Sequence, residues 1–161
     1  MQSALVLQNP ADAEALGSAL AARVTDLRAE VVLSPALGGI IIGHEVARAL
    51  GVRALFAERS APPAPTLGLR RGFTLKPGER VLVVEDVLTT GRSTRETMEV
   101  ARTAGAHVVG AAAIADRSGG TIDFGLPYKA LITLSLPTYD PAECPLCAQG
   151  LPVVKPGSRP G

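Results

Sequence analysis

Short apolar runs alternate with longer amphipathic stretches along most of this chain. The clearest run, residues 81–84, holds four consecutive apolar side chains, and similar runs lie at residues 31–33, 53–58, 107–115 and 130–134. Such runs are typical of strands that are buried on both faces of a parallel sheet. We therefore expect these segments to form one sheet.

The stretches between these runs carry the spacing and the end signals of helices. Asn9 and Pro10 suit the cap and the first position of a helix predicted over residues 10–28. Further helices are predicted over residues 40–50 and 93–104, each followed by a glycine that can end it. Strands and helices thus alternate, which predicts an α/β fold with a mostly parallel, twisted sheet flanked by helices and joined by right-handed crossovers.

Other segments have weaker patterns. Residues 5–7 and 71–75 are interpreted as short strands, and residues 59–68, rich in alanine and proline without any periodicity, as a mobile loop. From residue 137 onward proline and glycine recur, which predicts an extended tail packed on the surface.

Length and composition narrow the class of protein. The 161 residues, 47% of them hydrophobic, fit a single domain over residues 1–161 with a sizeable core. The net charge of +1 offers no general attraction to nucleic acid, and basic residues are not interleaved with aromatic ones. No apolar run approaches the roughly 20 residues that cross a bilayer, and no signal segment follows Met1. We therefore expect a cytoplasmic protein that binds neither nucleic acid nor membrane.

The strand predicted over residues 81–84 is followed by two acids, Glu85 and Asp86, and then by the loop Thr-Thr-Gly-Arg-Ser at residues 89–93, which leads into a helix. Ligands of parallel sheets bind at the C-terminal ends of strands, and a helix N-terminus favours an anion. A sugar phosphate suits both halves, because its hydroxyls donate to acids and its phosphate accepts from the loop. The plain alternative is a solvated acid pair beside a capped turn.

Residues 81–94 resemble the signature with which type I phosphoribosyltransferases bind phosphoribosyl pyrophosphate (PRPP). Residues 34–40, 69–73 and 115–120 are similar to the orotate phosphoribosyltransferase family, and the likeness covers nearly the whole chain. The resemblance implies the type I phosphoribosyltransferase fold and transfer of the 5-phosphoribosyl group from PRPP to orotate, giving orotidine 5′-monophosphate and pyrophosphate in pyrimidine and UMP biosynthesis. It also implies Mg²⁺ as cofactor and a homodimer.

In that family the acid pair contacts the ribose hydroxyls and the following loop holds the 5′-phosphate. The PRPP site that the resemblance implies is Glu85, Asp86, Val87, Leu88, Thr89, Thr90, Gly91, Arg92 and Ser93. The implied pyrophosphate loop is Ala36, Leu37, Gly38 and Gly39. Arg59, beside the predicted mobile loop, is expected at the catalytic centre as a pyrophosphate contact, and Arg70 and Arg71 flank the same loop.

The base and the metal have candidate residues too. Thr89 and Arg117 match positions that contact orotate in the family, and a planar guanidinium at a strand end suits an anionic pyrimidine. A surface arginine paired with Asp116 is the alternative. Mg²⁺ is expected on Glu85 and Asp86, partly through water, because it binds mainly substrate oxygens with one or two carboxylates assisting.

Two departures from the family pattern bear on function. The loop at residues 36–39 has no lysine, unlike that of some relatives, so its backbone N–H groups are left to bind pyrophosphate. Family members also carry several tens of residues before the segment that matches residues 3–7, forming a hood over the base, so the hood is expected to be truncated here. We interpret this as a translation start assigned too late, and loss of part of the base pocket is the alternative.

Two other functions fit the same motif. One is a phosphoribosyltransferase for another base, such as a purine, and the other is a non-catalytic PRPP-binding regulatory domain. Arg117 and residues 118–120 favour an anionic pyrimidine.

The two cysteines, Cys144 and Cys147, have the spacing of half a zinc site, since a structural site needs four ligands. Two reduced thiols in a C-terminal turn, or a metal shared across a dimer, both fit this spacing.

Overall fold

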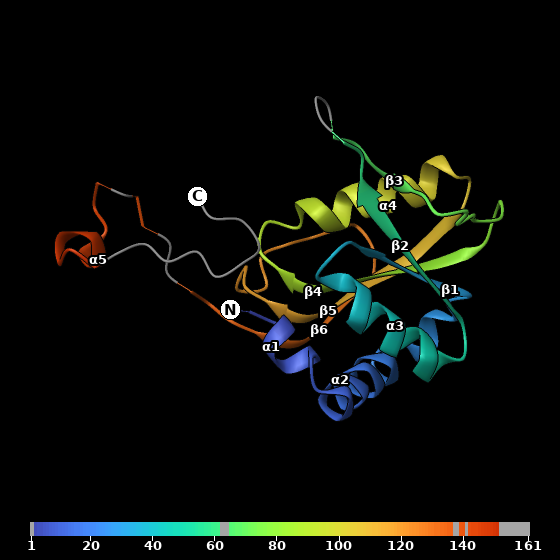
Figure 1. Ribbon diagram of the computed structural model, residues 1–161, viewed down its shortest axis with the longest axis horizontal. Helices are drawn as coiled ribbons and strands as arrows, with labels where there is room; N and C mark the ends of the chain where they lie inside the picture. Colours follow the sequence, from blue (N-terminus) through green and yellow to red (C-terminus); the bar gives the residue numbers. More distant parts are fainter. Residues whose placement is uncertain (1, 62–64, 137–138, 141, 152–161) are drawn as a thin grey trace.

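The computed structural model describes residues 2–61, 65–136, 139–140 and 142–151. Its centre is a six-stranded sheet in the order β3-β2-β1-β4-β5-β6 (Figure 1). The strands are β1 (Val31–Pro35), β2 (Arg53–Arg59), β3 (Leu67–Leu69), β4 (Arg80–Leu88), β5 (His107–Asp116) and β6 (Tyr128–Thr133). Neighbouring strands are parallel except for β2 with β3. The predicted α/β class and the strands predicted from the main apolar runs are confirmed.

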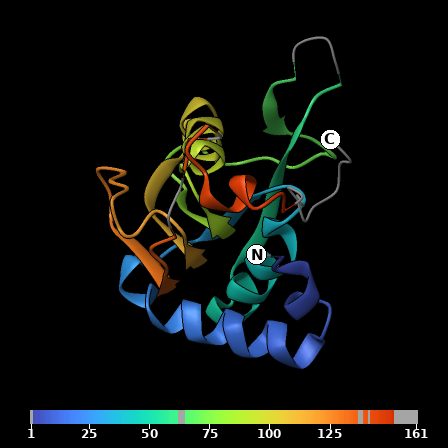
Figure 2. The ribbon, with the colours of Figure 1, turned by 90° about the vertical axis from the view of Figure 1, so that its left-hand side faces the viewer.

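Helices cover both faces of this sheet. They are α1 (Ala4–Leu7), α2 (Pro10–Ala22), α3 (Gly39–Leu50), α4 (Arg92–Thr103) and α5 (Pro145–Ala148), with a 3₁₀ turn at Thr25–Leu27. Figures 1 and 2 show α2 and α3 on one face and α4 on the other. The helices predicted over residues 40–50 and 93–104 are confirmed. None of the described helices has the length and apolar content that crossing a bilayer requires.

Strand β4 is fixed by burial on both sides. Leu82 and Val84 belong to a core cluster with α2 and α3, whereas Val81 and Val83 belong to the cluster that includes α4. All four side chains are fully buried. The acids that follow are therefore held at the C-terminal edge of the sheet by a strand that has no freedom to shift.

Residues 5–7 form α1 and not the predicted strand. The N–H groups of Leu7 and Gln8 donate to the carbonyls of Ser3 and Ala4, each at 2.9 Å, and Leu7 is buried in the core cluster shared with α2. Three apolar residues carry no periodicity that separates a strand from one helical turn. Packing on α2 decides the outcome.

Two further boundaries differ from the prediction. Helix α2 ends at Ala22, and the 3₁₀ turn that follows is closed by Arg28 at φ 48°. Residues 71–75 are not a strand, because Arg71 and Gly72 have φ values of 57° and 77°, which interrupt an extended backbone.

The segment predicted as a loop over residues 59–68 contains most of the edge strand β3, which pairs antiparallel with the end of β2. Residues 62–64 of that predicted loop lie outside the described residues. The tail predicted from residue 137 contains the one-turn helix α5 in its described part.

Candidate active site

Glu85 and Asp86 lie near the C-terminal end of β4, the strand that pairs with β1 on one side and β5 on the other. Glu85 is 7% exposed, whereas Asp86 is half-buried. The Asp86 N–H donates to Glu85 Oε1 at 3.3 Å. One carboxyl group is thus largely out of water and the other is partly accessible.

Burial raises the pKa of Glu85 from its ordinary value of 4.5 to about 9, and the adjacent Asp86 contributes to the rise. Removing a carboxyl from water disfavours its charged form, and a neighbouring acid does the same. Glu85 therefore holds a proton at neutral pH in the ligand-free protein. In that form it can donate as well as accept a hydrogen bond.

Replacing Glu85 with glutamine is expected to remove a pH dependence of stability. Because its pKa is raised in the folded state, the folded protein holds the extra proton between about pH 4.5 and 9, and stability falls across that window by up to about 1.4 kcal/mol per pH unit. Glu85→Gln should therefore unfold like the parent at about pH 5 and be more stable than it at about pH 8.5. Urea unfolding at both pH values measures this. Equal pH dependence in the two proteins would contradict the assignment of a buried, protonated acid.

Asp86 adjoins the loop predicted to hold pyrophosphate. A Cβ placed on Gly38 would lie 2.7 Å from Asp86 Oδ2, so a larger residue could not stand there without moving the carboxylate. The loop is anchored to β2 by the Ala36 N–H, which donates to the Ala57 carbonyl at 2.8 Å. Gly39 begins α3, so the N–H groups of this loop stand at a helix N-terminus. The acid pair and residues 36–39 therefore form one site.

The Leu37 side chain contributes little to the inside of this site. It is 77% exposed, the highest value among the large exposed apolar residues of the described chain. What the loop offers to a ligand is therefore its backbone.

The loop predicted to hold the 5′-phosphate joins β4 to α4. Gly91 has φ 73° and immediately precedes Arg92, the first residue of α4. Glu85 and residues 87–94 line a small cavity of about 40 Å³ at this turn. The turn brings backbone N–H groups and the positive end of the α4 dipole to the same place, which suits a phosphate.

A second cavity, of about 410 Å³, lies beside the phosphate loop. Its lining residues are Thr89, Thr90, Arg117, Ser118, Thr121, Ile122 and Leu136. The Arg117 N–H donates to the Leu88 carbonyl at 2.8 Å, which ties the arginine to the end of β4. Thr89 and Thr90 thus belong to both the phosphate loop and the cavity that contains Arg117.

Asp116 is not the partner of the Arg117 guanidinium. Asp116 is 1% exposed, and its Oδ1 accepts from the Ser118 N–H at 2.7 Å and from the Ser118 hydroxyl at 2.6 Å. No ion pair in the described part of the chain joins the two residues, and Arg117 Nε is buried there without a hydrogen-bond partner. The guanidinium is therefore left to bind a ligand in the cavity.

Comparison with known proteins gives one consistent result. The family model described as "Phosphoribosyl transferase domain" matches residues 4–132. An orotate phosphoribosyltransferase from Pelotomaculum thermopropionicum is 55% identical over 158 residues, which cover 98% of this chain and 82% of that protein. The corresponding protein from Thermotoga maritima is 48% identical over 159 residues, covering 99% of this chain and 83% of the relative. The chain belongs to the orotate phosphoribosyltransferase family.

A solved member of the family agrees with the fold. The crystal structure of the Mycobacterium tuberculosis orotate phosphoribosyltransferase in complex with Fe(III) dicitrate has a TM-score of 0.67 and 25% identity. The match covers 81% of this chain and 77% of that one. The type I phosphoribosyltransferase fold implied by the sequence is therefore confirmed.

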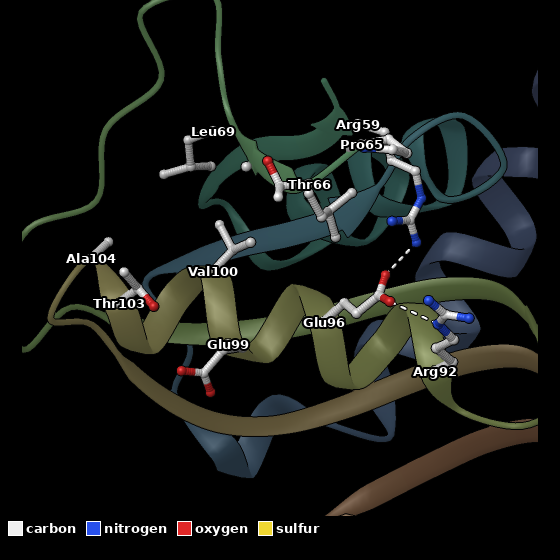
Figure 3. Close-up of a pocket in the computed structure, with 12 residues that line it drawn as sticks. Arg59, Pro65, Thr66, Leu69, Arg92, Glu96, Glu99, Val100, Thr103 and Ala104 are labelled. Atoms are coloured by element: carbon white, nitrogen blue, oxygen red, sulfur yellow. Dashed lines mark hydrogen bonds and ion pairs between the residues drawn. The ribbon is translucent and has the colours of Figure 1, made fainter. Parts of the chain in front are cut away.

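In this member of the orotate phosphoribosyltransferase family, Arg59 does not contact the acid pair. Its guanidinium pairs with Glu96 of α4, and Glu96 Oε1 also accepts from Arg92 Nε at 2.8 Å (Figure 3). These side chains lie at one end of a cavity of about 560 Å³ between α4 and the segment around β3. Arg71, also considered from the sequence, forms an ion pair with Glu58.

Replacing Glu96 with glutamine is expected to lower the KM for PRPP about two- to fivefold, because two arginines beside the phosphate loop lose the carboxylate that competes with phosphate oxygens. Glu99→Gln is the matched control. It makes the same charge change on the same helix, but Glu99 pairs with Arg102, 3.9 Å away, and not with the loop arginines. Steady-state kinetics at varied PRPP distinguish the variants. A higher KM in Glu96→Gln, or an equal drop in both variants, would contradict this reading.

Ser3 and Glu96 were given no site role from the sequence, although both contact predicted site residues. The spacing of Arg92 and Glu96, four positions apart on one helix, could have indicated their ion pair. The contact from Ser3 to Asp86 joins residues 83 positions apart, and no local pattern signals it.

Cys144 is half-buried and Cys147 is exposed, and both are free. The described residues contain no group of three or more histidine, cysteine or acidic side chains suited to a metal. A zinc ion shared across a dimer thus remains a prediction from sequence.

Proposed function

We propose that this protein transfers the 5-phosphoribosyl group from PRPP to orotate, giving orotidine 5′-monophosphate and pyrophosphate in pyrimidine and UMP biosynthesis. The observation that carries the proposal is the meeting of the acid pair, Gly38 and the loop at residues 89–93 at one edge of the sheet, with the Arg117 cavity beside them. These parts match the four parts of the reaction: ribose, pyrophosphate, 5′-phosphate and anionic base. The names of the close relatives support orotate as that base.

Catalysis by these residues rests on holding the sugar at both ends. Asp86 and Glu85 hydrogen-bond the ribose hydroxyls while residues 89–93 donate to the 5′-phosphate, so the anomeric carbon is fixed between the base and the leaving group. The bond to pyrophosphate breaks as the ribose gains positive charge, and the orotate nitrogen attacks from the opposite face. Backbone N–H groups of residues 36–39, at the N-terminus of α3, stabilise the charge that develops on the leaving group.

The donor set fits a Mg²⁺ ion that is bound mainly through substrate. Glu85 and Asp86 provide two adjacent carboxyl groups at the sheet edge, and Mg²⁺ commonly takes one or two carboxylates together with substrate phosphates and water. We assign these two residues to the ion, partly through water. Its contribution is to neutralise charge on the pyrophosphate.

Arg117 is the residue that selects an anionic pyrimidine. Its planar guanidinium can make paired hydrogen bonds to a carboxylate or carbonyl of orotate, and Thr89 offers a hydroxyl on the sugar side of the same cavity. Ile122 and Leu136 supply apolar surface for a planar ring. A purine would not supply the carboxylate that this arginine fits.

We also propose a cytoplasmic homodimer in which Arg59 contacts pyrophosphate. The family resemblance supports both the dimer and the arginine. Reaching the pyrophosphate requires Arg59 to exchange Glu96 for the substrate, which is an exchange of one anionic partner for another. Sedimentation equilibrium of the purified protein tests the dimer, and a monomer at micromolar concentration would remove it.

A spectroscopic assay of orotate consumption tests the proposed function. With PRPP and Mg²⁺ the protein should consume orotate and release pyrophosphate in equal amounts, and omission of either PRPP or Mg²⁺ should stop the reaction. Consumption of adenine or hypoxanthine in place of orotate would show a different base. PRPP binding without turnover of any base would show a regulatory domain.

A further inference from the structure

The hydroxyl of Ser3 donates a hydrogen bond to Asp86 Oδ2, although the two residues lie at opposite ends of the fold's sequence order. Ser3 directly precedes α1, and its carbonyl accepts from the N–H groups of Val6 at 3.0 Å and Leu7 at 2.9 Å. Leu7 is 4% exposed and belongs to the core. Ser3 is therefore anchored through α1 and does not simply lie on the surface.

Asp86 is confined on two sides by these neighbours. The Ser3 hydroxyl holds Oδ2, and Gly38 lies so close that a Cβ there would come within 2.7 Å of Oδ2 and 2.8 Å of Oδ1. A carboxylate offers about four lone-pair sites, so the bond from Ser3 leaves acceptor capacity for a ligand. No second side chain in the described part of the chain hydrogen-bonds to this carboxylate. Ser3 is thus the polar group that sets its direction.

We propose that Ser3 is a positioning residue, whose hydroxyl orients the Asp86 carboxylate so that its remaining lone pairs accept from a ribose hydroxyl of PRPP. This inference rests on the proposed function, since it assigns a role toward the same substrate. Without the hydroxyl, the half-buried carboxylate can turn about its side-chain bonds, and the cost of fixing it again is taken from PRPP binding. Ser3 itself need not touch the sugar.

Three variants test the proposal by equilibrium binding of PRPP with Mg²⁺. Ser3→Ala should raise the Kd for PRPP about three- to tenfold, the range expected for loss of one hydrogen bond, and leave the unfolding midpoint unchanged. Ser3→Thr keeps the hydroxyl and should restore binding. Ser18→Ala removes an exposed serine from α2 and serves as the control that changes nothing. In steady-state kinetics Ser3→Ala should raise the KM for PRPP without raising that for orotate.

Removing the proposed target supplies the decisive comparison. In an Asp86→Ala background the same Ser3→Ala change should have no further effect on PRPP binding, because there is no carboxylate to orient. An equal loss in both backgrounds, or unchanged or tighter binding in Ser3→Ala alone, would overturn the proposal. If the unsubstituted protein failed to bind PRPP, the proposed function would fall together with this role. If it bound PRPP and Ser3→Ala bound equally well, only the role of Ser3 would fall.

Discussion

Replacing Asp86 with asparagine is expected to lower kcat/KM for PRPP by about 10- to 100-fold, the range for loss of a hydrogen bond to a charged acceptor. The substitution keeps the size of the side chain but removes the charge that attracts both the ribose hydroxyl and Mg²⁺. Asp86 is half-buried at the end of a strand whose apolar residues carry the packing, so the fold should persist. Steady-state kinetics at varied PRPP and varied Mg²⁺, together with thermal unfolding, measure both parts of this expectation.

Asp26→Asn is the control for that experiment. Asp26 is exposed and lies in the 3₁₀ turn before β1, at the opposite end of the sheet from the site, so the same chemical change should leave the kinetics unaltered. Unchanged kinetics in Asp86→Asn would remove the acid pair from sugar binding. A kinetic loss accompanied by unfolding would assign Asp86 a structural role.

Replacing Gly91 with valine is expected to weaken PRPP binding by about 100-fold or more and to destabilise the protein by about 1–3 kcal/mol. Gly91 has φ 73°, a conformation that a β-branched residue adopts only under strain, and a Cβ there would lie 3.1 Å from the ring of Phe124. Relief of that strain must move the turn from which the backbone N–H groups reach the phosphate. Binding is therefore expected to suffer more than stability.

Gly51→Val separates strain from function. Gly51 has φ 70°, ends α3 at the opposite edge of the sheet, and has open space where its Cβ would stand. It should lose stability for the same backbone reason and keep the parent Kd for PRPP. Isothermal titration with PRPP and urea unfolding on both variants make the comparison. Equal Kd values in Gly91→Val and the parent would contradict the assignment of this turn to the phosphate.

The sequence indicated the parts of the fold in which one strong pattern acts alone. Residues 81–84 read as a buried strand because four apolar residues must face two cores at once, and they do. Residues 5–7 and 71–75 did not follow prediction, because runs of three to five residues are decided by neighbours: packing on α2 in one case and left-handed backbone at Arg71 in the other. The edge strand β3 was missed because its pairing with β2 is made by backbone groups that leave no periodic signal.

For the candidate site, the motif placed the acids and the phosphate loop in order along the chain, and the fold adds what lies beside them. The proximity of Gly38 to Asp86 follows from the pairing of β1 with β4, which brings the ends of two strands to one edge. The bond from Ser3 and the ion pair of Arg59 with Glu96 depend on side chains from distant segments. Contacts of that kind are products of the tertiary fold.

A crystal structure of the protein soaked with PRPP and Mg²⁺ tests the central claim most directly. The account predicts ribose hydroxyls within hydrogen-bond distance of Asp86 and Glu85, the 5′-phosphate enclosed by residues 89–93, and the pyrophosphate against residues 36–39. PRPP bound elsewhere on the molecule, or a sugar that leaves both acids without contact, would contradict it.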